Sequence, residues 1–205
     1  MPTVTQNASA VVIVTPPEAP DDLVVTVDAL KRNCGFATSE TDLDDVFRDL
    51  ILDATDYVEE AARTFLRPVT VDEQFESFPC GGNVFRLSRA PVRSLTGMTY
   101  YDVDGAIQTF DGASYAGWLD HNPPVVSLLG TAAWPATQYG RMPAVTIRYE
   151  AGPETVAGAK RGLYRAVMLI ATATYQNQDG RERSGPLVIP DAATAMILAT
   201  AQRGL

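Results

Sequence analysis

The stretch that decides the fold runs from Arg89 to Gly152. It contains the segments Met98-Thr99-Tyr100-Tyr101-Asp102 and Ala144-Val145-Thr146-Ile147-Arg148-Tyr149-Glu150-Ala151-Gly152. β-branched and aromatic side chains at a period of two fit a pleated, half-buried surface. Asp104-Gly105 lies between strand-like runs and is typical of a hairpin turn, because glycine tolerates a positive φ. The stretch therefore predicts an antiparallel β region, and nothing in it resembles a catalytic constellation. The predicted strands are Val84–Leu87, Leu95–Val103, Ile107–Phe110 and Val145–Tyr149.

Helical patterns flank this β region on both sides. Apolar residues recur at i, i+3, i+4 and i+7 from Leu43 to Phe65, with Ser39 or Thr41 as the N-cap and Pro68 as the terminator. A short helix is predicted from Val27 to Asn33, with Thr26 as its N-cap and Gly35 as its stop. Two further helices are predicted at 158–178 and 191–202.

These patterns predict an α+β fold in which long amphipathic helices pack as a small helical bundle with an inserted antiparallel β region and extended arms. The body spans residues 23–180, with helical parts at 23–67 and 155–180 and the β insert at 68–154. Residues 1–22 include Pro16, Pro17 and Pro20, which predicts a flexible N-terminal arm. Residues 181–205 are predicted to form a C-terminal docking tail.

The composition narrows the class of protein. With 46% hydrophobic and 20% charged residues over 205 positions, the chain is expected to be a soluble globular protein with a real core. A formal charge of -9 argues against tight binding along a phosphate backbone. Cys34 and Cys80 are expected to be ordinary reduced thiols, and neither a signal peptide nor a membrane-spanning segment is expected.

The long helix carries a run of carboxylates on its polar side. This run includes Asp49, Asp53, Asp56 and Glu60. Three interpretations stay open: a metal site, a plain solvated face and a contact with a subunit or another partner. Divalent-cation sites usually draw their carboxylates from a dedicated loop or from several elements, which disfavours the metal. No metal and no cofactor are therefore expected.

Arg86, Arg89 and Arg93 form the densest basic cluster of the β region. The cluster is compatible with contact to DNA or with ion pairs to an acidic neighbouring subunit. Because the chain as a whole is acidic, these arginines are assigned to a subunit contact together with the acidic helix face.

His121 is the only histidine, and it lies in a loop rich in asparagine and proline. A hydrolase that pairs His121 with Ser114 or Ser127 can be drawn, but nothing in the sequence places these residues together. An ordinary surface histidine is the simpler interpretation, and we expect no catalytic residue and no enzyme.

The C-terminal tail contains two runs of three consecutive apolar residues. These are Leu187, Val188 and Ile189, and Met196, Ile197 and Leu198. A helix of about a dozen residues is marginal alone in water, so these side chains need a surface to cover. Two alternatives remain: the tail folds back on its own domain, or it docks into another chain. The second is preferred, which makes these six residues candidate partner contacts.

Several tracts in joint order resemble the head–tail connector (adaptor) proteins of tailed bacteriophages, of the siphophage type also found in gene transfer agents. The tracts are 23–31, Thr41-Asp42, Ala54–Glu59, Ala133-Trp134-Pro135-Ala136 and Tyr149-Glu150-Ala151-Gly152. The resemblance extends from Leu23 to about Asn177. None of these residues is catalytic in character, so the specificity of the resemblance comes from their order.

The resemblance implies a non-enzymatic virion protein of the neck, made in the host cytoplasm. Such connectors form a ring of twelve copies beneath the portal protein, extend the DNA channel, and seat a stopper or tail-completion protein. Double-stranded DNA would pass through without specific binding, and the C-terminal tail would contact the portal. The alternative within the same class is that the chain is itself a stopper or tail-completion protein.

Overall fold

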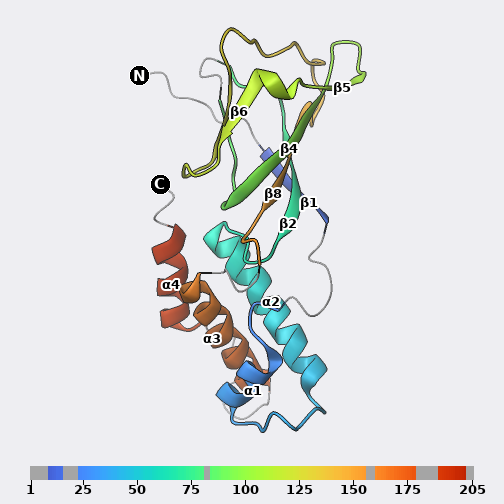
Figure 1. The fold of residues 1–205 in the computed structure, drawn as a ribbon. Coiled ribbons are helices and arrows are strands. Elements are labelled where there is room, and N and C mark those ends of the chain that lie inside the picture. The colour runs from blue at the N-terminus through green and yellow to red at the C-terminus, as the bar shows by residue number, and fades with distance from the viewer. Residues whose placement is uncertain (1–8, 16–22, 81–83, 156–159, 179–188, 202–205) are drawn as a thin grey trace. The chain divides into compact units, whose positions relative to one another are not determined.

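The structure is a computed structural model that describes residues 9–15, 23–80, 84–155, 160–178 and 189–201. The chain divides into two compact units (Figure 1). The β unit comprises Met1–Pro16 and Pro68–Gly152, and the helical unit comprises Pro17–Arg67 and Pro153–Leu205. Each unit is therefore assembled from two separate segments of the sequence.

The β unit contains two antiparallel sheets. The larger sheet has five strands in the order β1-β2-β8-β4-β5, and the smaller one has three strands in the order β3-β7-β6. The strands of the larger sheet are β1 (Ser9–Thr15), β2 (Val69–Phe75), β8 (Val145–Ala151), β4 (Val92–Tyr101) and β5 (Ile107–Thr109). Those of the smaller sheet are β3 (Val84–Arg86), β7 (Val125–Leu128) and β6 (Tyr115–Trp118), and a short 3₁₀ helix, η1 (Gly112–Ser114), precedes β6.

The central pairing of the larger sheet joins the first and last strands of the inserted segment. β2 and β8 pair without interruption from Val69 opposite Ala151 to Phe75 opposite Val145. Side chains of β2 alternate between buried and half-buried positions, as a period of two requires. The inserted segment, Pro68–Gly152, therefore begins and ends at neighbouring positions.

Aromatic side chains pack between elements of both sheets. Phe75 of β2 contacts Phe85 of β3, with ring centroids 4.6 Å apart. Phe78 stacks on Trp134 with centroids 4.9 Å apart, and Trp134 also meets Phe110. Aromatic pairs at such distances stabilise a core beyond the apolar area that they bury.

One carboxylate of the β unit, that of Glu73, is buried and hydrogen-bonded. Glu73 has no exposed surface. It accepts hydrogen bonds from the Tyr149 hydroxyl, at 2.9 Å, and from the backbone N–H of Ser88. Burial, and then the charge of Glu73, raise the pKa of Tyr149 far above its usual range, so its hydroxyl keeps the proton that it donates.

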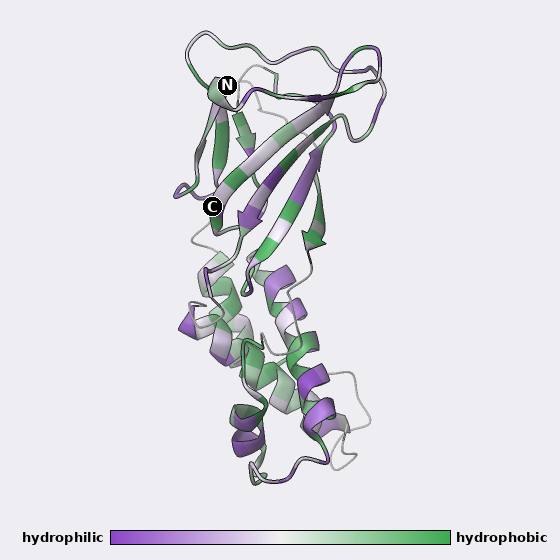
Figure 2. Cartoon of the chain, turned by 45° about the vertical axis from the view of Figure 1, so that its right-hand side comes forward, coloured by the Kyte–Doolittle hydropathy of each residue, from purple (hydrophilic) through white to green (hydrophobic). Residues whose placement is uncertain are grey.

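The helical unit contains α1 (Val27–Cys34), α2 (Asp44–Ala62), α3 (Arg161–Gln178) and α4 (Asp191–Ala201). Both hydrophobic and hydrophilic residues occur along these helices (Figure 2). Their apolar sides share one core, in which α2 and α3 pack together and α4 packs on both.

The predicted caps of α1 are confirmed: the Thr26 side chain accepts a hydrogen bond from Ala29, and Gly35 has a φ of 86°. α2 starts later than predicted, without a side-chain cap, and ends before Pro68 at Arg63, whose φ is 49°.

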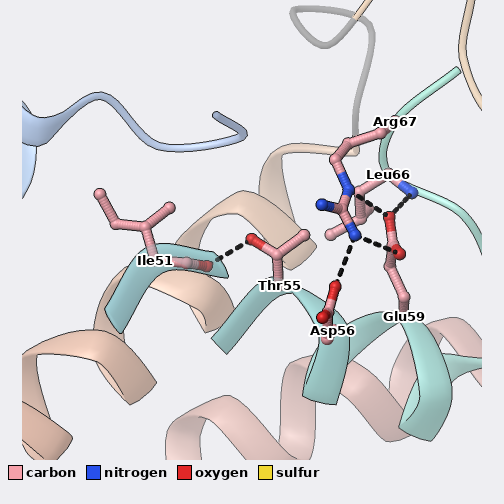
Figure 3. Close-up of polar contacts among 6 residues, drawn as sticks. All are labelled: Ile51, Thr55, Asp56, Glu59, Leu66 and Arg67. Atoms are coloured by element: carbon pink, nitrogen blue, oxygen red, sulfur yellow. Dashed lines mark hydrogen bonds and ion pairs between the residues drawn. The ribbon is translucent and has the colours of Figure 1, made fainter. Parts of the chain in front are cut away.

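A partly buried ion-pair network fixes the chain where α2 gives way to β2 (Figure 3). Glu59 of α2 accepts hydrogen bonds from the backbone N–H of Leu66 and from the Arg67 guanidinium. Asp56 accepts a second bond from Arg67, at 2.5 Å. Burial lowers the pKa of Arg67, but the hydrogen bonds and charges of Glu59 and Asp56 outweigh this effect and raise it above its ordinary value.

The predicted architecture of a small helical bundle with an inserted β region is wrong. The chain is α+β, but it is rich in β structure, with eight strands in two sheets and four α-helices among the described residues. β1, β2, β6 and β7 are absent from the prediction. β1 lies in the predicted N-terminal arm, where the neighbouring prolines outweighed the run from Ala10 to Val14, and it pairs with β2 in the structure. β6 is only four residues long and includes Gly117, so periodicity does not reveal it.

Among the described residues, no helix is long and apolar enough to cross a membrane.

Tyr149→Phe tests the buried carboxylate. The substitution removes one donor from Glu73 without changing the packing volume, so the free energy of unfolding should fall by about 1–3 kcal/mol. Urea unfolding measures it. Tyr139→Phe is the matched control, because Tyr139 is fully exposed, and should change stability by no more than about 0.5 kcal/mol. Equal effects of the two substitutions would contradict the role of this bond.

Arg67→Met tests the network at the end of α2. It leaves Glu59, which is buried, without its cation, and the free energy of unfolding should fall by about 3 kcal/mol. Arg63→Met, at an exposed arginine of the same segment, should change it little. The double variant Glu59→Gln/Arg67→Met should recover part of the loss; a double variant no more stable than Arg67→Met would count against an electrostatic origin.

Candidate interaction surfaces

The exposed side of α2 carries the acidic residues predicted from the sequence. We call this surface the acidic face; its members are Asp45, Asp49, Asp53, Asp56 and Glu60, all of them exposed. Val46 and Tyr57 lie on the same side and are 40% and 44% exposed. Asp56 bonds to Arg67 and Asp45 to Arg48. Within the described part of the chain, no three acidic, histidine or cysteine side chains are placed to hold a metal ion.

The three arginines predicted to form a basic cluster lie on different elements of the β unit. Arg86 lies in β3 of the smaller sheet, and Arg93 lies in β4 of the larger sheet. Arg93 is 3.8 Å from Glu150 of β8, and Arg89 is half-buried, with its charge acting on Tyr149. The chain passes from the smaller sheet to the larger one between Arg86 and Arg93. Their role in a subunit contact remains a prediction.

A second basic group, which sequence reasoning missed, lies at the start of α3. We call it the basic end; it consists of Lys160, Arg161 and Arg165, all exposed. None of them forms an ion pair with the described residues. Cations at the start of a helix oppose its dipole, so they gain nothing from their own helix. That mismatch, together with the absence of acidic residues from 160 to 178, is the sequence signal that could have revealed the group.

The tail differs in part from the predicted docking role. Ile197 of α4 is buried in the core of its own chain, and Ile189 and Met196 pack partly against it. Leu198 is 50% exposed on the other side of the helix. α4 thus folds back because α2 and α3 leave an apolar surface for it to cover. Leu187 and Val188 lie outside the described residues.

The loop around His121 shows no nucleophile–base pair. His121 lies between β6 and β7 on the rim of a shallow hollow whose lining is Gly117, Trp118, Leu119, Asp120, His121 and Asn122. The Ser114 hydroxyl bonds to Asp111, and the Ser127 hydroxyl lies 3.5 Å from its neighbour's carbonyl at Leu128. The structure therefore does not bring either serine into a hydrogen bond with His121.

An apolar surface at one end of the β unit was not predicted. We call it the apolar tip: Val103, Ile107, Tyr139 and Met142, which are 61%, 65%, 102% and 65% exposed. Two loops present these side chains, the hairpin between β4 and β5 and the segment that precedes β8. Large apolar residues gathered at such exposure mark a candidate contact surface.

Hydrogen bonds hold the apolar tip in one shape. Asp102 accepts bonds from the backbone N–H of Ala106 at 2.9 Å and from the Gln108 side chain at 2.8 Å. The Gln138 N–H donates to the Tyr101 carbonyl across the two loops, and the Arg141 guanidinium lies 3.4 Å from the centre of the Tyr101 ring. The bond from Gln108 and then that from Ala106 lower the pKa of Asp102 below its usual value.

No protein-family model matches the chain, and no curated protein matches it. Solved structures do. A chain from the "Virion of native gene transfer agent (GTA) particle" is 19% identical, with a TM-score of 0.72 over 92% of this chain and 93% of that chain. Chains from the "Neck of empty GTA particle computed with C6 symmetry" and the "Neck of native GTA particle computed with C12 symmetry" are 19% and 20% identical, with TM-scores of 0.70 and 0.67. Each of these two matches covers 93% of this chain and 94% of that chain.

At these identities the likeness establishes the fold. It covers nearly the whole length of both chains, so it includes the β unit and the helical unit alike. The class of fold is thus that of chains found in the virion and neck of a phage-like particle.

The apolar tip yields a prediction of pH dependence. Because folding lowers the pKa of Asp102, its bonds stabilise the hairpin above the unfolded-state value of about 3.9 and are lost as the pH falls through the folded-state value. Amide exchange at Ala106, corrected for its intrinsic rate, should therefore accelerate below about pH 4. Asp102→Asn still presents an oxygen acceptor but does not titrate, so its corrected exchange rate should not show this dependence. An unchanged dependence in Asp102→Asn would contradict the assignment.

Proposed function

We propose that this chain is a structural neck protein of a tailed phage or phage-like particle, and specifically its head–tail connector (adaptor). One observation carries the proposal: the likeness of the fold, across both units, to chains of a gene transfer agent virion and neck. In this role the chain forms a ring beneath the portal, extends the DNA channel and seats the next neck component. It works by shape and contact, without a cofactor or a chemical reaction.

The charge of the chain suits a channel through which DNA slides. Each copy carries a formal charge of -9, so a ring of twelve copies has a strongly negative field. Such a field repels phosphate groups and disfavours sticking of the double helix. The symmetric reconstructions of the related necks support a ring as the assembled form.

The tail helix has properties that fit contact with the portal. Its inner side, at Ala193 and Ile197, covers the core of its own chain. Its outer side exposes Ala192, Ala195 and Leu198, so the helix is apolar on both sides. Helices that are apolar all round are usually covered all round, and the portal is the proposed cover for the outer side. The apolar tip is proposed to contact the next neck component, a stopper or tail-completion protein.

Two substitutions separate the proposed contacts. Leu198→Glu places a charge on the outer side of α4, where a buried leucine would contribute about 1.5–3 kcal/mol, so capture by the portal protein should weaken by about tenfold or more. Ile107→Glu at the apolar tip should leave portal capture unchanged and weaken binding of the next component. Pull-down and calorimetry with each purified partner measure both effects, and circular dichroism checks the fold.

Three outcomes would count against this assignment. Undiminished portal capture by Leu198→Glu would remove the tail from the contact. Binding only to an already assembled connector ring would identify the chain as a stopper instead. If this chain carries a tag and the tag is absent from images of the particle neck, the structural role is refuted altogether.

A further inference from the structure

We propose that neighbouring copies in the ring meet through unlike surfaces of the helical unit, the acidic face of α2 on one copy against the basic end of α3 on the next. This inference rests on the proposed ring, and it identifies the surfaces that close it. Both surfaces belong to the same unit of the chain, and both are exposed.

Charge is segregated between the two helices. α2 carries seven acidic residues and one arginine between Asp44 and Ala62. Residues 160–178 contain three cations and no acidic residue. The buried sides of α2 and α3 face the shared core, so their charged sides point outward and do not neutralise each other. A neighbouring copy can bring the two together.

Each surface keeps charged members that are unpaired among the described residues. Asp49 and Asp53 form no ion pair with other described residues, and the same is true of the three cations of the basic end. Successive carboxylates repel each other along α2, and cations at the start of α3 oppose its dipole. When the acidic face of one copy meets the basic end of another, the repulsion among the carboxylates and the repulsion between the cations and the α3 dipole both decrease.

An exposed aromatic side chain borders the acidic face and offers apolar area to a protein contact. Tyr57 is 44% exposed and lies between Asp53 and Glu60 along the helix. Tyrosine and arginine are enriched at the centres of interfaces, and an arginine can stack on a tyrosine ring. An exposed tyrosine beside charged groups supplies the combination of apolar and polar contacts that protein interfaces use.

The occupant follows from this complementarity. Two unlike surfaces on one chain produce a head-to-tail contact, which closes into a ring when the rotation between copies allows it. The acidic face repels nucleic acid, so DNA cannot be its partner. A second copy supplies the basic surface without a further component.

Charge exchange tests the proposal with two variants that are complementary only to each other. The first, Asp49→Lys/Asp53→Lys, makes the acidic face basic. The second, Arg161→Glu/Arg165→Glu, makes the basic end acidic and suits the dipole of α3, so it should not unfold the helix. Each variant alone presents like charges at every contact and should self-associate at least about tenfold more weakly than the wild type. An equimolar mixture should restore assembly, with the two variants alternating.

Sedimentation velocity and native mass spectrometry over a range of protein concentrations report the assemblies and their composition. Arg32→Glu/Arg63→Glu is the matched control, since it reverses two exposed cations of the same helical unit that lie outside the basic end, and it should assemble as the wild type does. Wild-type association should also weaken as salt is raised.

Several results would overturn the contact. These are variants that assemble alone as well as the wild type, a mixture that assembles no better than its components, or a wild-type chain that shows no concentration-dependent association. Loss of DNA binding without loss of self-association in Arg161→Glu/Arg165→Glu would assign the basic end to nucleic acid instead. If every variant self-associates as strongly as the wild type, the proposed contact is wrong but the neck role stands. If the chain is missing from particle necks, the neck role is refuted whatever the equimolar mixture of variants does.

Discussion

The pairing of β2 with β8 is the constraint on which the rest of the structure depends. It places the first and last strands of the inserted segment side by side over seven residue pairs, so the segment begins and ends at adjacent positions. Sequence-distant helices, α2 before the insert and α3 after it, can then form one core. The buried bond between Glu73 and Tyr149 links the same two strands, and the Glu59–Arg67 pair fixes the chain just before β2 begins.

The surfaces of the two units differ in character. The β unit ends in an apolar tip that hydrogen bonds hold in one shape, while the helical unit carries an acidic face, a basic end and an apolar tail helix. A protein that works by assembly needs several distinct contacts of this kind, and each needs a rigid support. The number and the chemistry of these surfaces fit the proposed role, which itself rests on the likeness of the fold.

Sequence reasoning succeeded where local chemistry decides the structure and failed where distant segments meet. Thr26 and Gly35 predicted both ends of α1, because capping depends on neighbouring residues only. The exposure of Asp49 and Asp53 followed from the helical period. Arg86 and Arg93 lie in different sheets, which their spacing in the sequence does not reveal. The apolar tip could not be predicted, since it combines the β4–β5 hairpin with the segment before β8, and these meet through the bond from the Gln138 N–H to the Tyr101 carbonyl.

By itself, the sequence determined the helices, the antiparallel character of the β region, and the acidic side of α2, since periodicity, caps and charge are properties of contiguous residues. Tertiary structure alone decided that the β strands form two sheets around an aromatic core, and that Ile197 turns inward while Leu198 faces out. Those outcomes depend on which apolar surfaces remain to be covered once the helices and strands have paired. That choice minimises exposed apolar area over the whole unit, so no single segment encodes it.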